Sequence, residues 1–314
     1  MSARARLGEA WTEAVRARRG DLLVAWSLAV AYVALLLRTT KDLGYARDEG
    51  FYFQASSAYA RWFTELWRYP KTALEPRMVD AAWSANHEHP ALMKSLFGLS
   101  NLVFEKKLHL FAMEGTSFRL PAILLAGALV GLVYLWGASA RGRVAGLGAA
   151  VLFAAMPRVF FHAHLACFDV PIVALWTATA FAYERTLRKG GALWPALTGV
   201  FFGLALDTKH NAWFLPFALG AHAVAIGVYA RFVAKRPDAA RVRVLRALSA
   251  LAAMAVLGPL LLYALWPWIW HDTIARLRDY AAFHLHHEYY NMELFHETYW
   301  KPPMPRSYAW VMTI

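Results

Sequence analysis

Two adjacent carboxylates, Asp48 and Glu49, stand a short distance beyond the first long apolar segment, Leu22–Leu37. Carboxylates at the boundary between water and lipid carry a large desolvation cost unless they are solvated, paired or used in chemistry. A positioned carboxylate can act as a general base that removes a proton from a hydroxyl group. A solvated loop pair is the alternative interpretation, and the surrounding segments must distinguish the two.

Polar residues also gather in three later segments that separate apolar runs. The first runs from 161 to 171 and places Asp169 at the start of a predicted helix, where it could cap that helix. The second runs from 207 to 211 and contains Lys209 and His210, and the third runs from 271 to 304 and contains His271 and Arg276. We expect all of them on the side of a membrane that holds Asp48. This arrangement is typical of a site at the level of the lipid headgroups.

The composition indicates the class of protein that must position these residues. The chain is 59% hydrophobic and only 17% charged, whereas a soluble domain has about 25% charged residues. A membrane helix needs roughly 20 apolar residues, and short spans can be completed by flanking aromatic residues. The sequence therefore predicts an all-α polytopic membrane protein. Its candidate spans are Leu22–Leu37, Leu120–Ala138, Val144–Phe161, Val170–Tyr183, Leu193–Leu206, Ala212–Tyr229 and Leu248–Trp270.

The distribution of arginine and lysine orients these spans. If residues 1–21 form a basic cytoplasmic N-terminus, the inner short loops are rich in cations and the outer ones hold few. The membrane module then covers 22–314. The net charge of +12 is attributed to topology and to anionic lipid headgroups, and not to nucleic-acid binding. The outer loops fall at about 38–119, 162–169, 207–211 and 271–306.

Other features concern the ends of the chain and its cofactors. The first span lacks a small-residue cleavage site, which favours a retained anchor. An eighth span begins near Ser307 and is cut off at Ile314, so we expect further spans beyond it. A single cysteine, Cys167, excludes an intrachain disulfide, and no Walker or dinucleotide motif supports a nucleotide cofactor. Within the first outer loop, 51–67 and 91–104 have the pattern of helices lying in the interface.

Several short motifs in this order resemble a known family. They are Asp48-Glu49 after the first span, His87-Glu-His-Pro-Ala-Leu-Met-Lys94, Pro157 to Pro171 with Asp169, Gly203 to Asn211, and Trp266 to Asp272. Together they resemble the polyprenol-phosphate-sugar glycosyltransferases of the protein O-mannosyltransferase and aminoarabinose-transferase type, which have the GT-C fold. The resemblance covers about residues 20–314. It implies sugar transfer from a lipid-linked phosphate donor to an acceptor hydroxyl on the non-cytoplasmic side.

The resemblance also implies roles for particular residues. Asp48 corresponds to the general base that deprotonates the acceptor, with inversion at the anomeric carbon, and Glu49 accompanies it. Cations stabilise a departing phosphate, and Lys94, Lys209 and Arg276 are the candidates, in that order. Lysine and arginine at this level are also common headgroup anchors. Further polar groups of the substrate site would be Glu88, His89, Asp169, His210 and His271.

The sequence departs from the family pattern beside Pro90. The mannosyl type usually reads His-Pro-Pro-Leu, but here Ala91 follows Pro90, and the aminoarabinose type has lysine where this chain has His89. The donor sugar therefore stays open. Some relatives hold a metal near this motif, and Glu88, His89 and His271 could supply ligands. A divalent metal is possible, but no ligand spacing assigns one.

Two other classes of protein compete with the transferase. Secondary transporters place ionisable residues and broken helices at the bilayer midplane, often within internal repeats, whereas these spans are nearly free of charge and show no repeat. A non-catalytic lipid-binding subunit would keep the fold without turnover. We expect a GT-C-type glycosyltransferase of a bacterial inner membrane with a periplasmic site. Its partners would be a polyprenyl-phosphate-sugar donor, a protein, lipid or glycan acceptor, and membrane lipids.

Overall fold

The computed structural model describes residues 3–235, 237–286 and 291–311. The chain divides into two compact units, Met1–His271 and Asp272–Ile314. The first unit is almost entirely helical and the described chain contains only two short strands, which confirms the predicted all-α class. The last residues of the predicted eighth span, 312–314, lie outside the described residues, as do the first two of the basic N-terminus.

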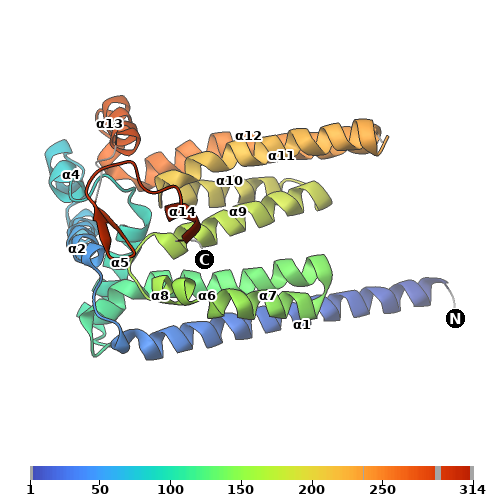
Figure 1. Ribbon diagram of the computed structural model, residues 1–314, viewed down its shortest axis with the longest axis horizontal. Coiled ribbons are helices and arrows are strands. Elements are labelled where there is room, and N and C mark those ends of the chain that lie inside the picture. The colour runs from blue at the N-terminus through green and yellow to red at the C-terminus, as the bar shows by residue number, and fades with distance from the viewer. Residues whose placement is uncertain (1–2, 236, 287–290, 312–314) are drawn as a thin grey trace. The chain divides into compact units, whose positions relative to one another are not determined.

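Long apolar helices make up most of the first unit and run lengthwise through it (Figure 1). Each of the first seven predicted spans corresponds to one helix or to consecutive helices, whereas only one helical turn, Tyr308–Val311, is described in the predicted eighth span. The helices are α1 (Ala3–Thr39), α6 (Glu114–Arg141), α7 (Arg143–Ala155), α8 (Pro157–Ala163), α9 (Asp169–Lys189), α10 (Leu193–Leu206), α11 (Leu215–Val228) and α12 (Pro237–Leu265).

Among the described residues, four helices are long and apolar enough to cross a membrane, and a bent pair adds a fifth. The four are Arg19–Asp42, Glu114–Arg141, His210–Val233 and Asp238–Leu265. The remaining two predicted spans, 170–183 and 193–206, are helical but are not among the helices long and apolar enough to cross a membrane. Helix α9 carries charges at both ends, and α10 has only 14 residues, about 21 Å at 1.5 Å per residue. The chain is therefore a polytopic membrane protein with helices of unequal length.

The predicted span 144–161 is not a single straight helix. Helices α7 and α8 meet at a break and are bent by 70°. Pro157 is the first residue of α8, and Met156 before it is extended, with φ −63° and ψ 120°. Proline cannot donate the helical hydrogen bond and disfavours helical geometry in the residue before it. The bend thus follows directly from the sequence.

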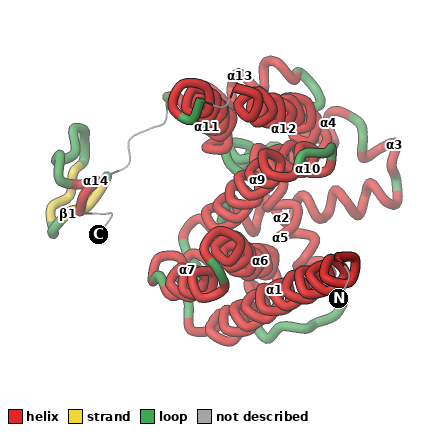
Figure 2. The backbone as a smooth tube through the Cα atoms, turned by 90° about the vertical axis from the view of Figure 1, so that its right-hand side faces the viewer, coloured by secondary structure: helices red, strands yellow, loops and turns green. Residues whose placement is uncertain are grey.

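Helix packing forms two groups, visible in Figure 2. Helices α1, α6 and α7 lie together, and α9 to α12 lie together, with α6 also contacting α9. Helices α10 and α12 approach closely at Gly199, where an added Cβ would lie 2.5 Å from the backbone oxygen of Ala253. Small residues permit such close backbone contact between membrane helices.

Shorter helices lie at one end of the lengthwise helices (Figure 1). Helix α2 (Arg47–Arg68) carries the Asp48-Glu49 pair, and α5 (Leu92–Ser100) continues as the π-helix η2 (Asn101–Lys107). These confirm the helices predicted at 51–67 and 91–104. Helices α2 and α5 touch at Gly98, where a Cβ would lie 2.1 Å from the Ser56 backbone oxygen. Shorter elements here are η1 (Thr40–Asp42), α3 (Pro70–Ala73), α4 (Pro76–Trp83), η3 (His210–Phe214) and η5 (Pro267–Ile269), whereas η4 (Tyr229–Val233) lies at the opposite end, between α11 and α12.

The second unit contains one longer helix and a small hairpin. Helix α13 (Thr273–Leu285) is followed by strands β1 (Met292–Leu294) and β2 (Glu297–Tyr299), which pair antiparallel with Met292 opposite Tyr299. A single turn of helix, α14 (Tyr308–Val311), ends the described chain.

Candidate active site

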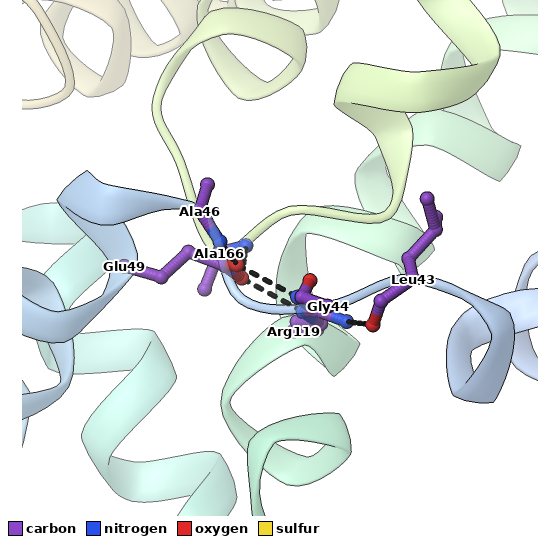
Figure 3. A network of polar contacts seen from close by, with 6 residues as sticks. All are labelled: Leu43, Gly44, Ala46, Glu49, Arg119 and Ala166. Carbon is purple, nitrogen blue, oxygen red and sulfur yellow. Dashed lines mark hydrogen bonds and ion pairs between the residues drawn. The ribbon is translucent and has the colours of Figure 1, made fainter.

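Glu49 is held in a buried polar network (Figure 3). Arg119 of α6 donates from Nε and from one terminal nitrogen to the two carboxylate oxygens, each at 2.7 Å, and neither side chain is exposed. The backbone N–H groups of Ala46 and Ala166 also donate to this carboxylate, both at 2.9 Å. Arg119 further donates to the Gly44 carbonyl at 2.7 Å. The network thus joins the start of α2, the start of α6 and the loop before α9.

Asp48 has a different environment, although it is the adjacent residue. It lies in the first turn of α2, where the positive end of the helix dipole favours a carboxylate. It is exposed, whereas Glu49 is completely buried. Successive residues of a helix point about 100° apart, so one can face the protein interior while the next faces solvent. Asp48 is therefore an accessible carboxylate on a backbone that Glu49 holds in place.

Three aromatic rings connect the carboxylate helix with two other segments. Tyr52 lies one turn after Asp48, and its ring is 4.4 Å from Phe168 and 6.0 Å from His89, measured between centroids. The His89 and Phe168 rings are themselves 4.9 Å apart. Contacts of this geometry between aromatic groups are favourable beyond the area they bury. The structure thereby brings together His89 of the first predicted outer loop and the residue before Asp169.

Asp169 and Lys209 form an ion pair next to this cluster. Lys209 Nζ lies 2.6 Å from one Asp169 oxygen, and His162 Nδ1 lies 3.8 Å from the other. Asp169 begins α9, as predicted, and its side chain is 48% exposed. Lys209 is 24% exposed, so a ligand could reach its ammonium group. The predicted second and third outer loops therefore meet.

The pKa of the buried Cys167 thiol depends on its burial and on the carboxylates around it. Burial raises its pKa to about 12, and the carboxylates of Glu49, Asp169 and Asp48 add to the effect. Burial likewise raises the pKa of Tyr52, with contributions from Asp48 and Asp169. Charges act over limited distances inside proteins. Asp48 and Asp169 therefore lie within electrostatic range of the same two groups.

Lys94 is fully buried, and its ammonium group is hydrogen-bonded to backbone carbonyls. Its ammonium group donates to the carbonyl of Asn86 and, at 2.8 Å, to the carbonyl of His89. It also lies 5.4 Å from the centroid of the Tyr59 ring. Burial lowers the pKa of Lys94 to about 7. This lysine fastens the 86–89 segment rather than presenting its charge to the surface.

Asp207, at the end of α10, fastens the two residues where α5 begins, Ala91 and Leu92. Its side chain accepts from the Ala91 N–H at 3.3 Å, and its backbone carbonyl accepts from the Leu92 N–H at 3.0 Å. Burial raises its pKa well above the usual range for aspartate, and the Lys94 charge opposes that rise. The start of α5 is thus tied to the third predicted outer loop.

The other predicted site residues occupy several surroundings. Glu88 is partly exposed and accepts from the Asn86 side chain at 2.5 Å. His210 begins η3, with its ring 6.1 Å from that of Trp213. His271, which ends the first unit, is partly exposed, with its Nε2 buried. Arg276 lies on α13 of the second unit and is partly exposed.

Sequence reasoning missed three residues that organise this region. The sequence places Arg119 at the end of a long predicted loop, Asp207 in a polar segment and Tyr52 in an amphipathic pattern, and none of these features by itself indicates a site residue. A charged residue inside an apolar helix usually has a buried partner, and Arg119 is five residues into α6. That signal could have found Arg119.

A metal ion needs a set of several ligand side chains close together. Among the residues that the structure describes, no group of three histidine, cysteine, aspartate or glutamate side chains is placed to hold a metal ion. Glu88, His89 and His271, the three candidate ligands, do not form such a group.

Comparison with known proteins identifies a family. The model of the dolichyl-phosphate-mannose-protein mannosyltransferase family matches residues 101–263, more than half of the 314 residues. The match includes Arg119, Asp169 and Lys209 and begins after Asp48 and Lys94. No curated protein and no solved structure matched the chain. With its apolar helices and this match, the chain belongs to the dolichyl-phosphate-mannose-protein mannosyltransferase family and is a membrane glycosyltransferase.

Proposed function

We propose that this protein transfers a sugar from a polyprenyl-phosphate-linked donor to an acceptor hydroxyl, with Asp48 as the general base. The observation that carries the proposal is the contrast between the two adjacent carboxylates. Glu49 is buried and fully paired, while Asp48 is exposed within electrostatic range of the groups near Asp169. A base needs an accessible carboxylate on a rigid support. We therefore assign the support to Glu49 and the proton transfer to Asp48.

The reaction follows from these positions. Asp48 takes the proton of the acceptor hydroxyl as its oxygen forms a bond to the anomeric carbon. The bond between that carbon and the phosphate oxygen breaks, and the electron pair leaves with the polyprenyl phosphate. Attack opposite to the leaving group inverts the anomeric configuration. Asp48 then releases its proton to solvent.

Lys209 is the candidate that best suits the departing phosphate. A cation placed where charge develops stabilises the transition state. Lys209 is partly exposed and paired with Asp169, whereas Lys94 is completely buried and bonded to carbonyl groups. We propose that the donor phosphate approaches Lys209 and that Lys94 keeps the 86–89 segment in position. Arg276 stays a candidate for a second phosphate contact.

The setting of the reaction is also a proposal. The excess of cations in the short loops at the opposite end from Asp48 favours a non-cytoplasmic site, which in a bacterium is the periplasmic face of the inner membrane. The family's description names dolichyl-phosphate mannose as donor and protein as acceptor. A hexose on a polyprenyl phosphate and a protein hydroxyl are therefore the first substrates to test.

The test is a transfer assay in membranes that contain the full-length protein and radiolabelled polyprenyl-phosphate sugars. We expect label to move to an acceptor with the wild type and to fall by about 100-fold or more with Asp48→Asn, which removes the base. Asp42→Asn is the matched control, because Asp42 is a nearby exposed acid on η1. Equal transfer by both variants would overturn the assignment of Asp48. No transfer by folded wild type with any donor would instead support the transporter or scaffold alternatives.

A further inference from the structure

A polar cavity lies at the opposite end of the long helices from Asp48. It has a volume of about 760 Å³ and is formed by the end of α9, by α11 and by the start of α12. Helix α9 begins with Asp169 at the candidate active site, and the cavity includes Glu184 and Arg188, four to five turns further on. This cavity is therefore distinct from the site described above.

Arginine side chains from two helices line the cavity. Arg246 of α12 donates to the carbonyls of Leu187 and Arg188 at 3.0 and 3.1 Å, so its guanidinium group is fixed against the end of α9. Arg188 forms an ion pair with Glu184. Arg243 of α12 makes no hydrogen bond or ion pair with the residues that the structure describes. One cation of the cavity is thus held in place by the backbone, and another is available for a ligand.

The rest of the lining is divided between polar and apolar groups. Asp238 and Glu184 add carboxylates, and Leu187, Ile226 and Val242 form an apolar wall. A lipid at the membrane surface needs both kinds of contact, because its headgroup is charged and its glycerol region adjoins the acyl chains. Guanidinium groups bind phosphate with paired hydrogen bonds, while carboxylates can accept from the hydroxyl or ammonium groups of a headgroup.

The cavity lies beside the ends of two helices that are long and apolar enough to cross a membrane. One apolar span ends at Val233 and the next begins at Asp238, so the cavity adjoins the end of both. Tyr229 and Phe232 are exposed nearby, and exposed aromatic residues are frequent at the membrane interface.

We propose that this cavity binds the phosphodiester of a membrane phospholipid, with Arg243 as its principal contact and Arg246 as a fixed second cation. The site lies at the opposite end of the helices from Asp48 and does not depend on the transferase reaction. Its carboxylates accept hydrogen bonds from the polar substituent of the headgroup.

Native mass spectrometry of the full chain in detergent tests this proposal. The probes are phosphatidylglycerol, phosphatidylethanolamine and diacylglycerol, which lacks the phosphodiester. We expect Arg243→Gln to weaken binding of the phospholipids about fivefold, the effect of one arginine near the membrane surface. Arg231→Gln is the matched control, because Arg231 is exposed at the same end and lies against Phe232 rather than in the cavity.

Comparing the two phospholipids shows whether the cavity recognises the phosphodiester that both contain or the net negative charge of phosphatidylglycerol. Loss of both on Arg243→Gln supports recognition of the shared phosphodiester, and loss of phosphatidylglycerol alone supports an anionic headgroup. The proposal is overturned if diacylglycerol binds as tightly as the phospholipids, or if Arg243→Gln and Arg231→Gln bind alike. Thermal unfolding of each variant shows whether the protein is folded, and Arg243 has no intramolecular bond to lose among the described residues.

Discussion

Arg119 contacts both carboxylate oxygens of Glu49 at 2.7 Å, across 70 positions of sequence and with neither side chain exposed. The pair connects the start of a membrane helix to the start of α2. Two backbone N–H groups complete the contacts of the carboxylate. Removing one member of such a pair leaves the other charge buried without compensation. This relationship explains why two adjacent acids have different surroundings, one buried and paired and the other exposed.

Glu49→Gln should destabilise the protein by about 3–5 kcal/mol, the usual cost of breaking a buried ion pair. Thermal unfolding in detergent or nanodiscs measures the effect. The control is Glu114→Gln, which breaks an exposed pair with Lys106 and should leave the melting temperature almost unchanged. A similar melting temperature for Glu49→Gln and wild type would show that the buried pair does not support the fold.

Lys209→Gln should weaken binding of polyprenyl phosphate, the product of the proposed reaction, because it removes a cation that ligand can reach. We expect a loss of about tenfold, typical of one charge-assisted contact of about 1.5 kcal/mol. Binding of the labelled product to purified protein provides the measurement. Lys41→Gln is the control, because it removes an exposed lysine on η1, directly after α1. This variant should bind polyprenyl phosphate as tightly as wild type. Equal losses in both variants would point to general attraction by surface charge.

Lys94 should make stability depend on pH. Its pKa is about 7 in the folded protein and 10.5 when unperturbed, so the unfolded chain binds more protons between these values. Stability due to Lys94 therefore rises with pH from about 7 to about 10.5. The melting temperature of wild type minus that of Lys94→Met should grow across this range. A difference that stays constant with pH would contradict the lowered pKa of Lys94.

Gly199→Ala should destabilise the contact between α10 and α12 by about 1–3 kcal/mol, a typical cost of overpacking. The added Cβ would lie 2.5 Å from the backbone oxygen of Ala253, which cannot move independently of its helix. Gly148→Ala is the matched control, because a Cβ there meets nothing within 4 Å. Thermal unfolding of the two variants should separate them. Equal melting temperatures would mean that the helices can move apart at little cost.

The sequence alone determined the all-α membrane class, the place of most helices and the end of the molecule where polar residues gather. Runs of apolar residues and the break at Pro157 act locally, since hydropathy and proline geometry depend on neighbouring positions. The amphipathic pattern of 51–67 likewise predicted α2.

Only the tertiary structure decided which polar residues are buried and paired and which are accessible. Glu49 and Asp48 are alike in sequence, and their burial differs because Arg119 and the loop before α9 cover one and not the other. Lys94 ranked first for phosphate in the sequence, yet carbonyl groups of the 86–89 segment surround it. Desolvation and pairing depend on residues distant along the chain, and short motifs do not encode those distances.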